Sequence, residues 1–332
     1  MQMDDARLLT LLESDDASLV EDLRCEASRV AVSVFGKRVF LRALVEWSNV
    51  CRNDCLYCGI RRSNTCVKRY TLDRESILSS CENAYSYGLR TFVLQGGENP
   101  KGAAALVPVV AEMRASWPDA AITLVLGELP FETYAALRKA GADRYLLRHE
   151  TATESHYARL HPAEMTLSHR LDCLRELRRL GFQVGMGMMV GSPYQTTANL
   201  IADIRLLESF RPEMIGVGPF VPQKDTPFGS FPAGSTETTL RLYSILRILL
   251  PDSLIPSTTA LSTLRQDGRK AGILAGANVI MPNFTPPTTR GAYNIYDGKP
   301  QTDAAEQFDA IKADMASIGY IIDPGRGDFK KH

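Results

Sequence analysis

Apolar, β-branched runs alternate with helical patterns along the chain after Val39, and this alternation constrains the fold most strongly. Strands separated by helices predict a parallel sheet with helical crossovers. Eight strand-like runs fit a closed (βα)8 barrel of the TIM type better than a doubly wound sheet, which usually has about five or six strands. The predicted strands are Val39–Glu46, Thr91–Gln95, Ala121–Leu126, Arg144–Leu147, Gln183–Val190, Met214–Val217, Leu254–Ser257 and Asn278–Met281.

In the segments between these strands, apolar residues recur about every 3.6 residues, which is the period of an α-helix. Several of these segments end at a glycine, as helices commonly do. Predicted helices include Arg74–Tyr87, Phe131–Ala140, Leu167–Leu180, Thr197–Phe210 and Thr236–Leu250. No linker, repeat or low-complexity stretch interrupts the pattern, so we expect a single domain. Its parts are an N-terminal helical extension over residues 1–35, the barrel over 36–297, and a C-terminal helix and tail over 298–332. Within the extension, Asp5–Val32 is expected to form a helical pair that caps the closed end of the barrel.

The composition narrows the class of partner. Lys+Arg and Asp+Glu both number 38, so no overall positive field favours nucleic acid. The first residues, MQMDDARLLTLLESDD, lack the basic and apolar regions of a signal peptide, and no run of about 18 apolar residues predicts a membrane span. Seven cysteines, three of them crowded, indicate reduced thiols in the cytoplasm rather than a disulfide framework.

Those three cysteines, Cys51, Cys55 and Cys58, have the spacing Cys-x3-Cys-x2-Cys and follow the first predicted strand by a few residues. The first βα loop of a barrel lies at the end where barrel enzymes carry their chemistry. An iron–sulfur cluster held by only three thiolates has one iron without a protein ligand, which can bind a chelating substrate and pass it an electron. The sequence therefore favours an iron–sulfur site in this loop.

Two other interpretations of the cysteines stay open. Zinc sites usually have four ligands, often as two closely spaced pairs, and no second pair exists here. Cys66 is the one nearby candidate for a fourth ligand, eight residues after Cys58. Three buried thiols in a turn would need no metal at all. Asn49, Arg52 and Asn53 could donate hydrogen bonds to cluster sulfurs, but an ordinary loop also contains such residues.

Polar residues follow two further predicted strands. Gln95-Gly96-Gly97-Glu98 ends the second: its glycines allow close approach of a ligand, and its carboxylate can accept hydrogen bonds from an ammonium group. A tight turn would account for the glycines but not for the glutamate. Arg148-His149-Glu150-Thr151 ends the fourth, and these groups should face a cavity because burial in a packed core is costly. A plain salt bridge between Arg148 and Glu150 is the competing interpretation.

The cysteine motif, with an aromatic residue before its last cysteine, resembles the signature of radical S-adenosylmethionine (SAM) enzymes. In that superfamily three thiolates hold a 4Fe-4S cluster, the open iron binds the amino and carboxylate groups of SAM, and reduction yields a 5′-deoxyadenosyl radical. Further segments resemble the FeFe-hydrogenase maturase family HydE, over about residues 35–297. They read WSNVCRNDCLYCGIRR, KRY, LQGGENP, RYLLRHETA, GVGPFVP and GANVIMPNFTP.

The resemblance implies roles for the residues at matching positions. The metal ligands would be Cys51, Cys55 and Cys58, holding one 4Fe-4S cluster. The SAM-binding residues would be Tyr57 toward the adenine, Gly96, Gly97 and Glu98 toward the amino group, Glu150 toward the ribose hydroxyls and Arg170 toward the carboxylate. The catalytic residues would be Arg148, directed at the substrate, and Thr123, Thr258 and Thr259, which line a small anion or substrate site.

The implied partners are a small-molecule or organometallic substrate, other hydrogenase maturases, and an electron donor such as ferredoxin or flavodoxin. The chain departs from this family in three places. It has no second cysteine set after Cys173, Gly96 stands where serine is usual, and GSPYQT replaces GLPGQT. Alternative functions are therefore a methylornithine synthase-like radical SAM mutase, or an iron–sulfur carrier or scaffold without substrate chemistry.

Overall fold

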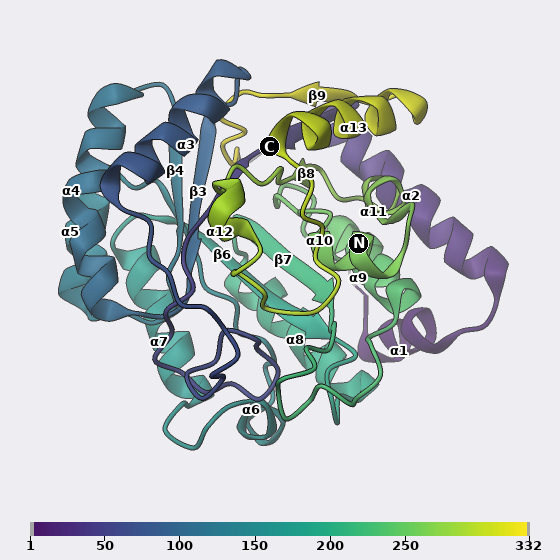
Figure 1. The fold of residues 1–332 in the computed structure, drawn as a ribbon. Coiled ribbons are helices and arrows are strands. Elements are labelled where there is room, and N and C mark those ends of the chain that lie inside the picture. The colour runs from purple at the N-terminus through teal and green to yellow at the C-terminus, as the bar shows by residue number, and fades with distance from the viewer. Residues whose placement is uncertain (1–2, 331–332) are drawn as a thin grey trace.

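Six parallel strands, β2 to β7, lie side by side in sequence order in the computed structural model, which describes residues 3–330 (Figure 1). Strand β8 pairs with β1, and isolated bridges from Met214 to Leu254, Pro256 to Val279 and Leu44 to Asn283 complete the circle. The predicted (βα)8 barrel is confirmed. The strands are β1 Arg38–Leu41, β2 Ala43–Ser48, β3 Thr91–Gly96, β4 Ala121–Val125, β5 Arg144–Leu146, β6 Gln183–Val190, β7 Met214–Pro219, β8 Val279–Ile280 and β9 Ile321–Asp323.

Two predicted strands differ from the observed ones. The first, Val39–Glu46, is divided into β1 and β2 because its two halves have different partners: β1 pairs with β8 and β9, whereas β2 pairs with β3. The seventh, Leu254–Ser257, is reduced to single bridges. Pro256 has no N–H to donate to a ladder, which limits pairing there.

Helices cover the outside of the barrel, and three of the predicted stops are observed. Gly88, Gly141 and Gly181 follow α3, α5 and α7 with φ of 86°, 115° and 81°, a conformation in which glycine is unstrained. None of the helices described over residues 3–330 could cross a membrane. The helices are α1 Asp5–Glu13, α2 Ala17–Phe35, α3 Arg74–Ser86, α4 Pro100–Ser116, α5 Phe131–Lys139, α6 Glu154–Leu160, α7 Leu167–Arg179, α8 Thr197–Phe210, α9 Thr236–Leu249, α10 Thr259–Leu264, α11 Gly268–Leu274, α12 Pro287–Arg290 and α13 Ala304–Ser317.

The N-terminal helices lie on the side of the barrel rather than across its closed end, contrary to expectation. Helix α1 packs against α8, and α2 packs along α9 and α11 (Figure 1). The buried residues of α2, from Leu23 through Ala27 and Ala31 to Phe35, recur every four residues and so form one stripe that matches a neighbouring helix. Residues 1–2, at the start of the expected extension, lie outside the described residues.

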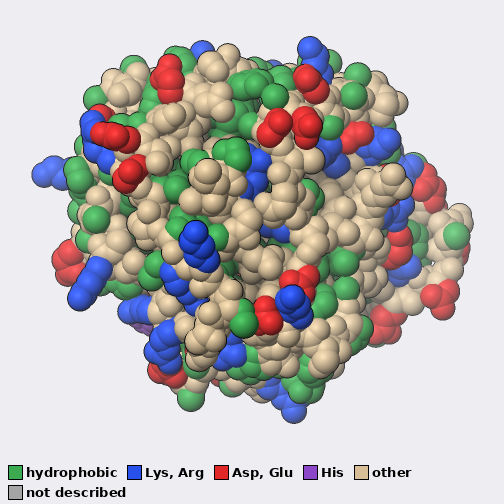
Figure 2. Space-filling view, in the orientation of Figure 1, with side chains coloured by type: hydrophobic (Ala, Val, Ile, Leu, Met, Phe, Trp, Pro, Cys, Tyr) green, Lys and Arg blue, Asp and Glu red, His purple; other side chains and the backbone are tan. Residues whose placement is uncertain are grey.

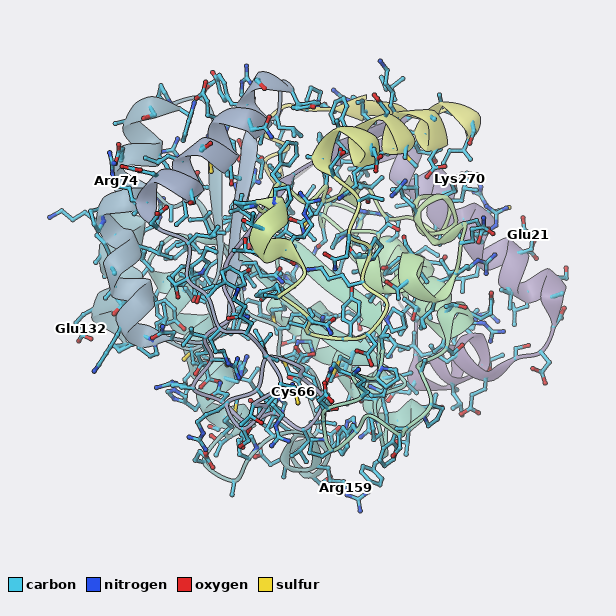
Figure 3. All side chains as sticks on the ribbon, viewed as in Figure 1. Glu21, Cys66, Arg74, Glu132, Arg159 and Lys270 are labelled. Atoms are coloured by element: carbon cyan, nitrogen blue, oxygen red, sulfur yellow. The ribbon has the colours of Figure 1, made fainter. Side chains whose placement is uncertain are left out.

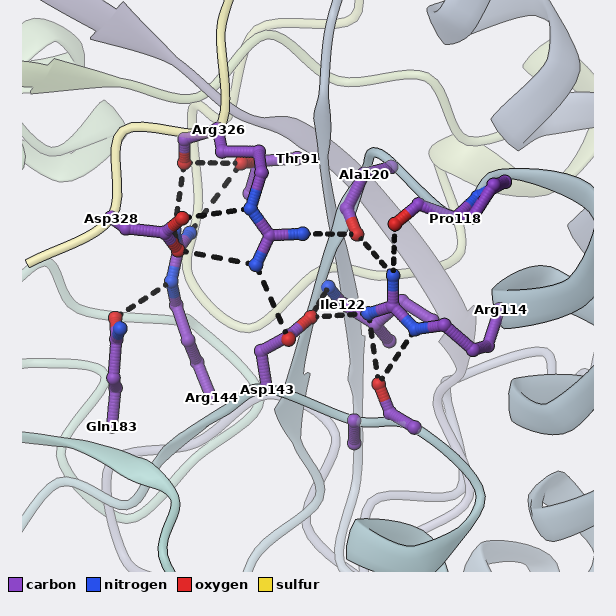
Figure 4. Close-up of polar contacts among 12 residues, drawn as sticks. Thr91, Arg114, Pro118, Ala120, Ile122, Asp143, Arg144, Gln183, Arg326 and Asp328 are labelled. Atoms are coloured by element: carbon purple, nitrogen blue, oxygen red, sulfur yellow. Dashed lines mark hydrogen bonds and ion pairs between the residues drawn. The ribbon is translucent and has the colours of Figure 1, made fainter.

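The C-terminal tail occupies the closed end instead. Strand β9, which the sequence did not predict, pairs with β1, and the chain beyond it crosses beneath the strands. The fully buried guanidinium of Arg144 donates to the backbone oxygen of Arg326 at 2.7 Å and pairs with Asp328 at 2.6 Å, while Arg326 pairs with Asp143 (Figure 4). The tail therefore supplies the carboxylate for a charge inside the barrel. Residues 331–332, the end of the expected tail, lie outside the described residues.

Replacing Asp328 with asparagine should destabilise the fold, because it leaves the buried charge of Arg144 without its carboxylate. The Asp328 side chain is 30% exposed, so we expect the free energy of unfolding in urea to fall by about 2 kcal/mol, less than for a fully buried pair. The matched control is Asp119→Asn, whose partner Arg90 is near the surface, and it should cost at most about 0.5 kcal/mol. Equal losses in the two variants would contradict the assigned role of the tail.

Candidate active site

The three motif cysteines lie in the loop after β2, at the rim formed by the carboxyl ends of the strands. Their side chains are half-buried, and the backbone N–H of Leu56 between them donates to the Leu160 oxygen at 2.9 Å. Burial, and then the neighbouring Cys51, raise the pKa of the Cys58 thiol to about 12. Burial and the other two thiols likewise raise the pKa of Cys55. These groups become thiolates only beside a strong positive charge, such as that of bound iron.

Arg69 holds the loop in shape. Its guanidinium donates to four backbone oxygens, at 2.6 to 3.1 Å, on Asn49, Ile60, Arg61 and Asn64. The Asn49 side chain is also occupied within the protein: its amide donates to the oxygens of Lys68 and Ala292, and its own oxygen accepts from the N–H of Tyr70. The proposed donation from Asn49 to a cluster sulfur is therefore wrong, because every part of that amide already has a protein partner.

The thiols do not converge on a single point. Within residues 3–330, no group of three His, Cys, Asp or Glu side chains is arranged to hold one metal ion. A zinc ion needs its ligands at about 2.0–2.3 Å, whereas a cluster bonds each thiolate to a different iron and so needs them farther apart. Three half-buried thiols on one loop can hold the cluster that the cysteine spacing predicts.

The two glycines after β3 are required by packing. A Cβ on Gly97 would lie 2.5 Å from the Val50 oxygen and 2.8 Å from the Cβ of Cys51, and one on Gly96 would lie 2.3 Å from the indole nitrogen of Trp47. The backbone at Gly97 thus lies directly against the first cysteine. This close approach accounts for the glycine pair more specifically than a tight turn does.

Glu98 lies in the same turn and is nearly fully buried, and both of its oxygens already have protein partners. Arg52 contacts one oxygen at 2.8 Å, and the backbone N–H of Glu128 donates to the other at 2.7 Å. Each carboxylate oxygen can still accept another hydrogen bond. Glu98 therefore links the cysteine loop to the loop after β4, and its predicted contact with an ammonium group stays a prediction.

Arg170 and Glu128 continue this chain of charges. Arg170 lies near the start of α7, with its Nε 2.6 Å from a Glu128 oxygen, and it donates to the backbone oxygen of Arg148 at 3.1 Å. Sequence reasoning missed Glu128, although it follows the end of β4 by only three residues, and Glu98 follows the end of β3 by two. The strand-end rule that selected Glu98 would have selected Glu128 as well.

Arg148 and Glu150 form an ion pair, with 3.1 Å between nitrogen and oxygen. The Nε and Nη2 atoms of Arg148 and the Oε2 atom of Glu150 are nonetheless buried without a well-oriented hydrogen bond among the described residues. Glu150 has φ of 65°, a strained conformation for a side chain of this kind, and such strain gathers at functional sites. The competing salt bridge is present and joins Nη2 to Oε2, so the donor that it leaves without a partner among the described residues is the Nε of Arg148.

The predicted threonines and Tyr57 lie in different surroundings. Thr123 has a buried hydroxyl without a described partner, and Thr259 lines a small cavity with Lys299. Thr258 caps α10 and lies 3.4 Å from the hydroxyl of Tyr243. The hydroxyl of Tyr57 lies 3.0 Å from the Nε2 of His161, and its ring meets that imidazole edge to face. One edge of the Tyr57 ring is therefore already in contact with His161.

Residues 45–207 match the family model of the Radical SAM superfamily. The chain is 43% identical over 289 residues to the [FeFe] hydrogenase maturase subunit HydE of Thermotoga maritima. The aligned region covers 87% of this chain and 82% of that protein. The chain belongs to the radical SAM superfamily. It is also 30% identical to a 3-methylornithine synthase of Methanosarcina acetivorans, over 83% of this chain and 78% of the relative. The crystal structure of methylornithine synthase (PylB) superposes with a TM-score of 0.86 at 26% identity, covering 97% of this chain and 95% of that one.

Radical SAM proteins use a 4Fe-4S cluster and SAM, and these are the cofactors of this chain. The residues present fit both groups. The cysteine loop offers three thiols, and the rim beside it offers two buried polar atoms without partners among the described residues, the Nε of Arg148 and the hydroxyl of Thr123. The assignment of individual side chains to parts of SAM stays a prediction.

Gly97→Ala should block cluster assembly while the barrel stays folded. The added methyl group would displace Cys51, so we expect iron bound per chain after anaerobic reconstitution to fall roughly fivefold or more. Gly291→Ala is the matched control, because a Cβ there has its nearest neighbour at 3.7 Å. Normal iron content in Gly97→Ala, with an unchanged circular dichroism spectrum, would show that the turn can move without affecting the thiols.

Proposed function

We propose that this protein is a HydE-like maturase that reductively cleaves SAM to a 5′-deoxyadenosyl radical and acts in assembly of the di-iron subcluster of the FeFe-hydrogenase H-cluster, in the cytoplasm. One observation carries the proposal. Three half-buried thiols close together on the first βα loop lie beside a rim of paired charges in a chain that is 43% identical to HydE over most of its length.

Each part of the rim has a chemical task in this proposal. Cys51, Cys55 and Cys58 would hold a 4Fe-4S cluster, which would supply the electron for reductive cleavage of SAM. The backbone at Gly97 and the carboxylate of Glu98 hold the amino group of SAM, Arg170 its carboxylate, and Glu150 its ribose. Tyr57 packs beside the adenine.

The substrate would bind deeper in the barrel. Arg148 has one buried nitrogen, Nε, without a partner among the described residues, while its Nη2 pairs with Glu150, and a guanidinium can bind anionic or cyanide-bearing groups through charge-assisted hydrogen bonds. Thr123, Thr258 and Thr259 add hydroxyl groups. The proposed substrate is a small organometallic one, a cysteine-bound iron carbonyl cyanide unit supplied by a partner maturase, and ferredoxin or flavodoxin is the proposed source of electrons.

A methylornithine synthase-like mutase is the second candidate, because the PylB crystal structure has a TM-score of 0.86 with this chain. Anaerobic incubation with lysine, SAM and a reductant would yield methylornithine under that alternative and none under the maturase proposal. A carrier or scaffold without catalysis would need no charged rim in a barrel mouth, and it would leave SAM intact.

Cys55→Ala tests the cluster assignment. Reconstituted wild-type protein should reach a plateau near four irons per chain, since no second cysteine group is present after Cys173, and it should release 5′-deoxyadenosine from SAM when dithionite is added. The variant should lose most of its iron and all SAM cleavage. Cys66→Ala is the control and should retain both. Four irons in Cys55→Ala would indicate a different set of ligands, and eight in the wild type a second cluster.

Arg148→Lys tests the substrate assignment. Lysine keeps the charge but not the planar fork of donors, so we expect hydrogenase maturation to fall by about tenfold, which corresponds to about 1.4 kcal/mol of transition-state stabilisation. SAM affinity and uncoupled 5′-deoxyadenosine release should change little. Glu150→Gln is the comparison, and its main effect should be weaker binding of SAM. Loss of SAM binding or of the fold in Arg148→Lys would support the purely structural salt bridge.

A further inference from the structure

We propose that the rim beside the cysteine loop is the docking surface for an acidic protein that carries one electron, with Tyr194 and Arg159 at its centre. This inference rests on the proposed function, because reductive cleavage of SAM takes one electron from outside the chain. When the carrier gives up its electron, the flavin hydroquinone anion that it holds becomes the neutral semiquinone. The electron reduces the 4Fe-4S cluster from the 2+ to the 1+ state, and no proton moves.

Tyr194 is the first observation. It has φ of 69° and is 52% exposed, so a bulky side chain is held in a strained conformation with half its surface in water. It lies in GSPYQT, at the position where the resembling family has glycine, which would carry no strain. Strain that is kept at a surface position indicates a use for the side chain there.

The ring belongs to an aromatic cluster that reaches the cysteine loop. Arg159 lies over Tyr194 at 4.4 Å, and Phe231 and Phe228 lie 5.6 and 6.2 Å from it between ring centres. The backbone N–H of Phe228 donates to the oxygen of Leu56, which lies between the second and third cysteines. Contacts made at Tyr194 are thus connected by packed side chains to the predicted cluster site.

Positive charges lie on the three segments that backbone hydrogen bonds join at Leu56: Arg62 and Lys68 on the cysteine loop, Arg159 near the end of α6, and Lys224 in the loop before Phe228. These four side chains are exposed and have no ion-pair partner among residues 3–330; the exposed acids on the same segments are Glu154, Glu164 and Asp225. Figure 2 shows Lys and Arg side chains, with fewer Asp and Glu among them, over the lower part of the molecule, and Figure 3 shows Arg159 at the outer edge on the side of the cysteine loop, where Cys66 is labelled. Aromatic residues and arginine at the centre of a cationic surface are typical of a site for an acidic protein.

The test uses reconstituted holoprotein and reduced bacterial flavodoxin as the donor, with 5′-deoxyadenosine release as the measurement. In Tyr194→Gly, KM for flavodoxin should rise by about tenfold at low salt, whereas the rate with dithionite is unchanged. The melting temperature should stay level or rise, because glycine relieves the strain at φ of 69°. Arg159→Glu should raise KM similarly, and salt should weaken wild-type binding to flavodoxin.

Two matched controls separate docking from stability. Arg211→Gly relieves strain at another residue with positive φ, 51°, at the end of α8, and Phe131→Ala removes an exposed aromatic ring that lies under Arg179. Both should leave KM for flavodoxin unchanged.

Unchanged KM in Tyr194→Gly and Arg159→Glu would overturn the inference. So would normal flavodoxin kinetics combined with reduced hydrogenase maturation, because the surface would then belong to an assembly partner. Failure of wild-type protein to cleave SAM with dithionite would contradict the proposed function instead.

Discussion

Parallel pairing around the barrel is the constraint on which the rest of the structure depends. Since β2 to β7 run in one direction and in sequence order, the loops that follow β2, β3, β4 and β5 meet at one rim. That rim collects residues far apart in the chain, from Cys51 to Glu150. Parallel pairing of neighbouring strands brings these loops together without a ligand.

Charge pairing then links one loop to the next. Arg52 pairs with Glu98, Arg170 with Glu128, and Arg148 with Glu150, and the N–H of Glu128 donates to Glu98. The Arg170–Glu128 pair is buried, and such a pair adds little net stability because desolvation offsets the attraction, but breaking it is costly, whereas the pairs of Arg52 and Arg148 are partly exposed. Such a chain suits a site that must hold loops in one arrangement, and it couples the cysteine loop to the SAM-binding residues proposed above.

The two ends of the barrel are closed differently. At the rim, Arg69 binds four backbone oxygens and keeps the cysteine loop folded around its thiols. At the opposite end, β9 and Asp328 bring the tail under the strands, where Arg144 is fully buried. The helical pair α1 and α2, expected there, lies along α8 and α9 instead. The tail thus completes the core, and the N-terminal extension widens the outer layer.

The sequence by itself determined the barrel, most of its helices and the cysteine site, because periodicity, glycine stops and close spacing are local properties of a chain. It also placed Glu98, Arg148 and Glu150 at strand ends. Tertiary structure alone decided the rest. Whether Leu254–Ser257 pairs as a full strand depends on the neighbouring strands and on Pro256. Which surface α2 covers depends on the side chains that α9 exposes to it. The partners of Asn49 and the link through Glu128 join residues tens to hundreds of positions apart. No local pattern records such contacts, because they form only when separate strands are aligned in the closed barrel.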